Sequence, residues 1–222
     1  ADIPNTSINE DSYLVIDLLP YVESDYEGYL AFSYFSDTSD VHIDPDGEYF
    51  GMIPSNNWNG TSIITVIVTN EYDLSDTTSF ELTVLPINDA PVIEAIPDTS
   101  MDEDSALFLE LSATDVDGDY LSFSVDPVDN IDAFIFADGD SLMLVPDGNW
   151  YGVTDVTVHV TDGNEQASTG FSLTVNPVDD EPFVDGYLAD VYMYEDSPEP
   201  WEADLSEVFT DIDGELTFST EL

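Results

Sequence analysis

The feature that most constrains the fold of this chain is an internal repeat of about 92 residues. The segment Ile-Asn-Glu-Asp-Ser at 8–12 returns as Met-Asp-Glu-Asp-Ser at 101–105 and as Met-Tyr-Glu-Asp-Ser at 193–197. A hexamer bounded by prolines, Pro-Ile-Asn-Asp-Ala-Pro at 86–91, returns as Pro-Val-Asp-Asp-Glu-Pro at 177–182. Such periodicity is typical of tandem structural units. We therefore predict repeat 1 at 1–88, repeat 2 at 89–179 and part of a third repeat at 180–222.

Repeat 2 has the pattern of a chain built from short β-strands. Apolar and polar residues alternate in seven runs separated by turn residues, and no segment has a helical period. In the sixth run, for example, Val156, Val158 and Val160 share one face. The predicted strands, named A to G, lie at 91–96, 106–113, 120–126, 133–137, 141–146, 153–160 and 168–176.

Seven short strands in one repeat, with frequent turns, are typical of an immunoglobulin-like β-sandwich. We therefore expect an all-β chain of seven-stranded sandwiches joined end to end. One barrel across both repeats is the alternative, but the repeated linker speaks against it, because its prolines favour an extended connector. The third repeat reaches only strands A to C, so it is cut short, as we favour, or completed by another chain. The lack of an initiator Met also suggests an excerpt of a longer protein.

The charge of the chain excludes several kinds of partner. It contains 50 Asp and Glu residues and no Lys or Arg, which gives a formal net charge of −50. Nucleic acids are bound through cationic side chains, so we exclude them, and anionic membrane surfaces with them. No apolar run is long enough for membrane insertion, and the chain has no cysteine. Because the carboxylates have no internal counter-charge, salt or bound cations must screen them.

The strand order determines which acidic loops share an end of each sandwich. The A–B and E–F turns lie at the end where strand G leaves, and the B–C and F–G turns lie at the opposite end. Stacked repeats then bring acidic groups from two repeats to each linker. At the first linker we expect Glu10, Asp11, Asn88, Asp89, Asp115, Asp117 and Asp162. At the second we expect Glu103, Asp104, Asp147, Asp179, Asp180, Asp211 and Asp213.

Five to seven converging oxygen groups suit calcium, which takes 6–8 oxygen ligands in flexible geometry, better than magnesium, which requires a stricter octahedron. Two unit charges 4 Å apart interact by about 4 kcal/mol at an effective dielectric constant of 20, so such a cluster repels itself without a cation. The sequence therefore predicts calcium ions (Ca2+) at the linkers. It also predicts repeats that are jointed without calcium and rigid with it.

The same residues resemble those of cadherin repeats, and more closely those of bacterial cadherin-like tandem repeats. The shared motifs are Asn9-Glu10-Asp11, Asp115-Val116-Asp117-Gly118, Asn149-Trp150-Tyr151-Gly152, Val160-Thr161-Asp162-Gly163 and Asn88-Asp89-Ala90-Pro91. The resemblance implies a calcium-stiffened spacer of a secreted bacterial adhesin or surface protein, with neighbouring repeats of the chain as partners. Repeat 1 departs from the pattern at 25–28 and 70–71, and we take Asn56 as the counterpart of Asp147.

Two other functions stay open at this point. The repeats themselves can bind a surface glycan or like chains, which exposed aromatic residues on one sandwich face would favour. Alternatively, the partial repeat exchanges strands with another chain in an extracellular filament. We interpret Trp58 and Trp150 as structural, and His42 and His159 as surface residues. No nucleophile, base and acid recur together in a plausible arrangement, so we expect no enzyme.

Overall fold

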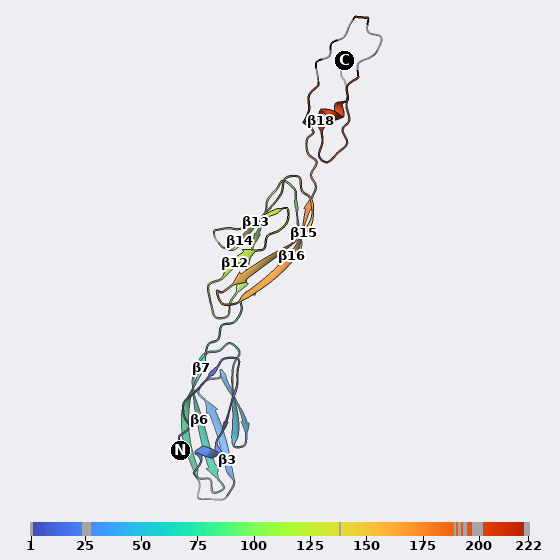
Figure 1. The fold of residues 1–222 in the computed structure, drawn as a ribbon. Coiled ribbons are helices and arrows are strands. Elements are labelled where there is room, and N and C mark those ends of the chain that lie inside the picture. Colours follow the sequence, from blue (N-terminus) through green and yellow to red (C-terminus); the bar gives the residue numbers. More distant parts are fainter. Residues whose placement is uncertain are drawn as a thin grey trace. The chain divides into compact units, whose positions relative to one another are not determined.

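The computed structural model describes residues 2–23, 28–137, 139–188, 190, 192, 195–196 and 202–219. Its regular secondary structure is almost entirely β-strand (Figure 1), which confirms the predicted all-β fold. The chain divides into two compact units, Ala1–Asp89 with Val116–Gly118, and Ala90–Asp115 with Asp119–Leu222. The boundary at 89/90 falls inside the first linker. The finer division into three repeats stays a prediction.

The first unit is a sandwich of two sheets. One sheet has the order β1-β7-β6-β3 and the other has the order β2-β5-β4. Among the described residues of this unit, only β1 and β7 pair in parallel, with Thr6 opposite Leu82, and the other pairs are antiparallel. The strands are β1 Thr6–Asn9, β2 Leu14–Asp17, β3 Leu30–Ser36, β4 Val41–Asp46, β5 Tyr49–Pro54, β6 Gly60–Asn70 and β7 Ser75–Leu85, with a short 3-10 helix η1 at Leu19–Tyr21.

The second unit contains a sandwich of the same design. Its sheets have the orders β12-β15-β16-β9 and β10-β14-β13, with a two-stranded ladder β11-β8 beside them. As in the first unit, the strand of the four-stranded sheet that comes first in the chain, β9, pairs in parallel with the strand that comes last, β16. The strands are β8 Val92–Ile93, β9 Thr99–Asp102, β10 Leu107–Glu110, β11 Ala113–Thr114, β12 Ser122–Val125, β13 Ile131–Ile135, β14 Ser141–Pro146, β15 Gly152–Thr161 and β16 Gln166–Asn176.

The predicted strand A is wrong in extent. The structure places only Val92–Ile93 of the predicted 91–96 in a strand, and it adds β9 at Thr99–Asp102, which the alternation does not mark. Pro97 lies between the two pieces and has no N–H to donate to a ladder. Predicted strand B is likewise split into β10 and β11. Strands C, D, F and G agree within two residues at each end, and E agrees at both ends.

Each core lies between the two sheets of its sandwich. Alternate residues of β14 and β15 point inward, so that Leu142, Leu144, Val156 and Val158 are fully buried. Phe50 takes the corresponding place in the first unit, where Tyr34 stacks on it at a ring-centroid distance of 4.7 Å. Burying one such side chain contributes about 1.5–3 kcal/mol, which explains why period-2 alternation is strict in these strands.

The Asn-Trp-x-Gly motif forms a structural corner, as predicted for its tryptophans. Trp58 and Trp150 pack against the cores of their units. The glycine two residues later lies against the indole: a Cβ on Gly60 would come 3.0 Å from Trp58 Cζ2, and one on Gly152 would come 3.2 Å from Trp150 Cζ2. Both glycines have φ near +155° (153° and 156°), a conformation that other residues rarely adopt,.

The end of the second unit holds a smaller ladder. Strand β17, Phe183–Val184, pairs antiparallel with β18, Phe209–Thr210, and a 3-10 helix η2 at Leu205–Glu207 precedes β18. The third copy of the Glu-Asp-Ser motif, at 193–197, lies partly outside the described residues, as do residues 25–27 of repeat 1. No helix in the described part of the chain has the length and apolarity needed to cross a membrane.

Candidate metal centre

A buried glutamate attaches each linker to the sandwich that precedes it. Glu103 follows β9, whose parallel pairing with β16 brings it beside the start of the second linker. Its Oε1 accepts a hydrogen bond from the Val178 N–H at 2.7 Å. Glu10 makes the same contact in the first unit, where its Oε1 accepts from the Ile87 N–H at 2.7 Å. The two side chains are only 2% and 3% exposed. The glutamates therefore hold the backbone of both linkers in place.

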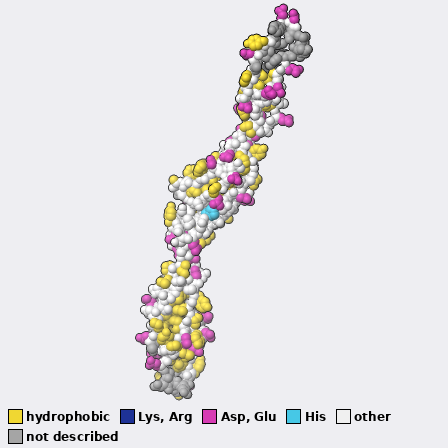
Figure 2. All heavy atoms as spheres, in the orientation of Figure 1, with side chains coloured by type: hydrophobic (Ala, Val, Ile, Leu, Met, Phe, Trp, Pro, Cys, Tyr) yellow, Lys and Arg dark blue, Asp and Glu magenta, His cyan; other side chains and the backbone are white. Residues whose placement is uncertain are grey.

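The second oxygen of each glutamate is buried without a hydrogen-bond partner. This holds for Oε2 of Glu10 and Oε2 of Glu103. A buried carboxylate normally has either a hydrogen-bonded cationic partner or a metal ion, because an uncompensated charge is costly to remove from water. The chain has no Lys or Arg that could serve, and the face drawn in Figure 2 accordingly has no dark-blue atoms. Each of these carboxylates therefore binds a linker through one oxygen and keeps a second oxygen buried with no positively charged partner.

An asparagine that the sequence analysis missed connects the next aspartate to the linker. The Asn149 N–H donates to Asp104 Oδ1 at 3.4 Å, and its Nδ2 donates to Asp180 Oδ2 at 2.6 Å. Asn57 repeats both contacts in the first unit, to Asp11 at 3.0 Å and to Asp89 at 3.0 Å. Both asparagines have positive φ, 57° and 61°, which asparagine tolerates better than most residues,. Their repetition before each tryptophan was the available signal.

The assignment of Asn56 as the counterpart of Asp147 is wrong. In the structure the Trp150 N–H donates to the carbonyl of Asp147, and the Trp58 N–H donates to the carbonyl of Ser55. Ser55 is therefore the equivalent of Asp147, and the first unit has no carboxylate at this turn position. Asp147 itself is exposed, and the side chain that reaches the linker from this turn is that of Asn149.

Loops that follow the linkers add further aspartates. The Asp180 N–H donates to Asp213 Oδ2 at 3.0 Å, and Asp211 Oδ1 in turn accepts from the N–H groups of Asp213 and Gly214. At the first linker, the Asp89 N–H donates to Asp117 Oδ2 at 2.8 Å; residues 116–118 group with the first unit. The predicted pairs Asp89 with Asp117, and Asp180 with Asp213, are thus in direct contact.

The aspartates at the second linker repel one another. Partial burial raises the pKa of Asp180 above its ordinary value of 3.8, and the nearby carboxylates of Asp104 and Asp213 raise it further. The adjacent Asp179 adds a smaller repulsion, while the hydrogen bond from Asn149 opposes these effects. Three carboxylates from three separate loops therefore share one electrostatic environment, with no Lys or Arg in the chain to balance them.

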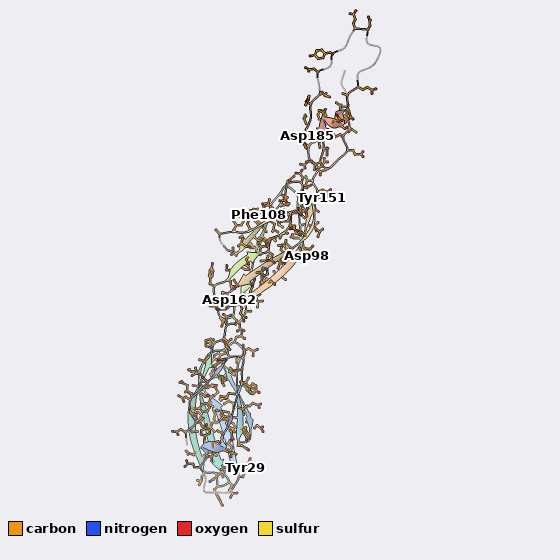
Figure 3. The ribbon with its side chains drawn as sticks, in the orientation of Figure 1. Tyr29, Asp98, Phe108, Tyr151, Asp162 and Asp185 are labelled. Carbon is orange, nitrogen blue, oxygen red and sulfur yellow. The ribbon has the colours of Figure 1, made fainter. Side chains whose placement is uncertain are left out.

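The remaining predicted residues lie where the strand order requires. Ser122 of β12 pairs with Thr161 of β15, so the loop that contains Asp115 and the turn that contains Asp162 share one end of the second unit. Asp162 accepts hydrogen bonds from the N–H groups of Asn164 and Glu165. Figure 3 labels it at one end of this sandwich, with Tyr151, next to Trp150, at the other. Asn88 is half-buried in the first linker, and Asp179 is exposed in the second.

The donor set fits a hard cation, although it does not form a closed cage. Every group named above offers oxygen, which is the ligand that calcium prefers. Within the described residues, however, no three acidic or histidine side chains converge closely enough to define a metal centre. Of the two histidines, His42 is exposed and His159 pairs with Asp126 at 3.1 Å, away from the linkers. The arrangement presents oriented carboxylates that repel one another.

A known protein family matches the second sandwich. Residues 88–176 match the family described as bacterial Ig domain. The second sandwich is therefore similar to a bacterial Ig domain. The match begins within the first linker and ends with β16, so it covers the whole sandwich of the second unit. The first unit has the equivalent sheet orders and the same parallel closing pair, so the two units are sandwiches of one design.

Solved structures of related shape include cadherin domains. Human protocadherin-24 EC1-2 aligns with 14% identity over 78% of this chain and 95% of that chain, with a TM-score of 0.46. Cadherin domains 1–5 of protocadherin gamma B2 align with 17% identity over 96% and 46%, with a TM-score of 0.45. An endo-fucoidan hydrolase of glycoside hydrolase family 107 aligns with 14% identity and a TM-score of 0.33, and this chain spans 28% of its length. No curated protein matches the chain.

Proposed function

We propose that this chain is a spacer segment of an extracellular bacterial adhesin or surface protein, and that calcium at the linkers makes it rigid. Tandem bacterial Ig-like units, joined by short proline-bounded linkers, support a structural role in which each unit adds length. The proposal assigns no catalytic activity to the chain. Its partners are calcium ions and the neighbouring repeats of the same chain.

The observation that carries the proposal is the buried Oε2 of Glu103, with its counterpart in Glu10. Each oxygen lies beside a linker, lacks a hydrogen-bond partner and belongs to a chain without Lys or Arg. A bound calcium ion would supply the positive charge that these carboxylates need. At the second linker the ligands would come from Glu103, Asp104, Asp180, Asp211 and Asp213. At the first they would come from Glu10, Asp11, Asn88, Asp89 and Asp117.

The chain's own groups explain why a cation would stiffen the linkers. Glu103 and Asn149 belong to the sandwich, Asp180 to the linker and Asp213 to the loop that follows it. Without a cation, the carboxylates of Asp104, Asp180 and Asp213 repel one another and favour separation of these parts. With the charge neutralised, the hydrogen bonds through Asn149 and the linker backbone can hold the parts together. Extracellular calcium modules bind the ion at about 10⁻⁴–10⁻³ M, which matches an extracellular setting.

Calcium titration of the whole chain tests this function. Isothermal titration calorimetry should show binding in that concentration range, and small-angle scattering should show a larger maximum dimension in calcium than in chelator. The variant Glu103→Gln should lose binding at the second linker, and Glu10→Gln should lose it at the first. Scattering profiles that are identical in calcium and chelator, together with no heat of binding, would show that the spacer is not controlled by calcium.

A further inference from the structure

The outward face of the sheet β10-β14-β13 carries an exposed cluster of apolar side chains. Phe108 on β10, Met143 on β14 and Phe134 on β13 lie directly opposite one another in register. Phe136 follows β13, and its ring stacks with that of Phe108 at a centroid distance of 5.9 Å. The three phenylalanines are 61%, 48% and 40% exposed, for Phe108, Phe134 and Phe136. We call these four residues the phenyl face.

Burial within the sandwich does not explain the phenyl face. The inward positions of the same strands, Leu142 and Leu144, already fill the core with no exposure. Phe108 and Phe134 point to the opposite side of the sheet, because successive side chains of a strand alternate between its faces. Figure 2 shows hydrophobic side chains on the visible surface of the second unit, near the strands that Figure 1 labels β13 and β14. Exposed large apolar groups that lie together mark interaction surfaces more often than scattered ones do.

The equivalent face of the first unit lacks this cluster. There, Val15 on β2 pairs with Gly51 on β5, and Gly51 pairs with Asp44 on β4. Valine, glycine and aspartate thus replace the phenylalanine, methionine and phenylalanine of the second unit. The phenyl face is therefore not a requirement of the repeat fold. The equivalent face of the first unit exposes Val15, Tyr49 and Ile53 instead, and therefore provides a comparison surface that is apolar but has no phenylalanine.

Carboxylates flank the phenyl face. Glu110 of β10 and Asp132 of β13 occupy outward positions on its two edges and are exposed. A second copy of the chain has no Lys or Arg to pair with them and would add charges of the same sign. Charge complementarity therefore requires cations from a different molecule. The apolar centre requires that the same molecule also offer apolar side chains.

The size of the face limits the partner. Three strands about 4.8 Å apart, with three alternating residues each, give a platform of roughly 10 Å by 14 Å. A stable interface between globular proteins buries about 800 Å² on each partner, several times more. We propose that the phenyl face binds a short cationic peptide segment of a partner protein, in which apolar side chains alternate with Arg or Lys. The apolar side chains would cover Phe108 and Phe134, and the basic groups would pair with Glu110 and Asp132.

Nuclear magnetic resonance titration of the ¹⁵N-labelled whole chain tests this proposal. The probe is a synthetic peptide of alternating Leu and Arg, compared with one of alternating Ser and Arg that has equal charge, at high ionic strength to suppress general attraction. The Leu-Arg peptide should shift the amide signals of β10, β13 and β14. The double variant Phe108→Ser/Phe134→Ser should weaken binding at least tenfold, whereas Val15→Ser, in the equivalent place of the first unit, should not.

A second variant separates the role of charge from that of the rings. Glu110→Gln/Asp132→Asn should lower the affinity for the Leu-Arg peptide several fold. It should leave the fold intact, since both side chains are exposed. Equal binding of the Ser-Arg peptide would overturn the proposal, because general charge attraction would then suffice. Cellohexaose that shifts the same amides in place of the peptide would show a glycan surface instead. A dimer in sedimentation that Phe108→Ser/Phe134→Ser dissolves would show a contact between like chains and would also overturn it.

Discussion

Replacing Glu103 by glutamine should change the response of the chain to calcium more than its stability without calcium. Glutamine keeps an oxygen that can accept the Val178 N–H, and it removes the charge from the buried Oε2 position. Without calcium, the weaker hydrogen bond costs about 1 kcal/mol, and the unpaired amide NH2 that replaces Oε2 costs about 1–3 kcal/mol. Removal of the uncompensated buried charge offsets these costs, because an unpaired charged group is more expensive to bury than an unpaired neutral one. The free energy of unfolding in chelator should therefore change little.

In calcium the same substitution should be destabilising. An ion present at one hundred times its dissociation constant stabilises the folded state by about 2.7 kcal/mol. A change of 1 kcal/mol shifts the melting temperature of a domain of 60–100 residues by about 4–8 °C, so calcium should raise the melting temperature of the wild-type second sandwich by roughly 10–20 °C. Glu103→Gln should retain less than half of that gain.

Differential scanning calorimetry in calcium and in chelator measures both quantities. The matched control is Glu110→Gln, which removes an equal charge from an exposed position of the same sandwich. That control should keep the full calcium gain. If Glu103→Gln gains as much from calcium as the wild type does, the unsatisfied oxygen has no part in ion binding, and the main support for the proposed function is lost.

Three further predictions concern the same corner of the fold. Asn149→Asp removes the donor to Asp180 and adds a like charge, so it should lower the urea midpoint in chelator, with a smaller effect in calcium. Gly152→Ala places a Cβ 3.2 Å from Trp150 at φ 156°, which should cost about 1–3 kcal/mol in urea unfolding, whereas Gly148→Ala, with open space around it, should cost less than 1 kcal/mol,. Because the folded chain holds the Asp180 proton more tightly than the unfolded chain, the stability contributed by this group is present below pH 3.8 and declines as pH rises above that value,. We therefore expect the melting temperature of the wild type, relative to that of Asp180→Asn, to fall as the pH rises from 3 to 7. Both proteins are measured in chelator, and Asp180→Asn lacks the titrating group.

The sequence predicts the long strands well because burial enforces their pattern. Leu142 and Leu144 alternate with half-buried residues, and the limits of β14 follow directly. The sequence does not reveal β9, since Met101 is its only buried residue and Thr99 and Ser100 resemble a turn. This strand is defined by its parallel ladder with β16, a long-range pairing that local alternation cannot express.

The acidic site was predictable in its location but not in its connections. Strand order alone brings Glu103 and Asp180 to one end of the sandwich, and this follows from counting turns. The role of Asn149 depends on its left-handed backbone, which turns the amide toward Asp180. A search for carboxylates overlooks such a residue because it donates hydrogen bonds rather than carrying charge. The lone oxygen of Glu103 likewise becomes visible only when burial is known.

The parallel pairing of β9 with β16 has a mechanical consequence. A pulling force that enters near the start of the sandwich and leaves at its end acts on two adjacent strands in opposite directions. Their four register pairs, from Thr99 with Leu173 to Asp102 with Asn176, are then loaded in shear, so their hydrogen bonds must break together and not one after another. The parallel pairing of β1 with β7 is loaded in shear in the same way in the first unit. Tension along the chain would thus meet its greatest resistance at the strands that also position Glu10 and Glu103.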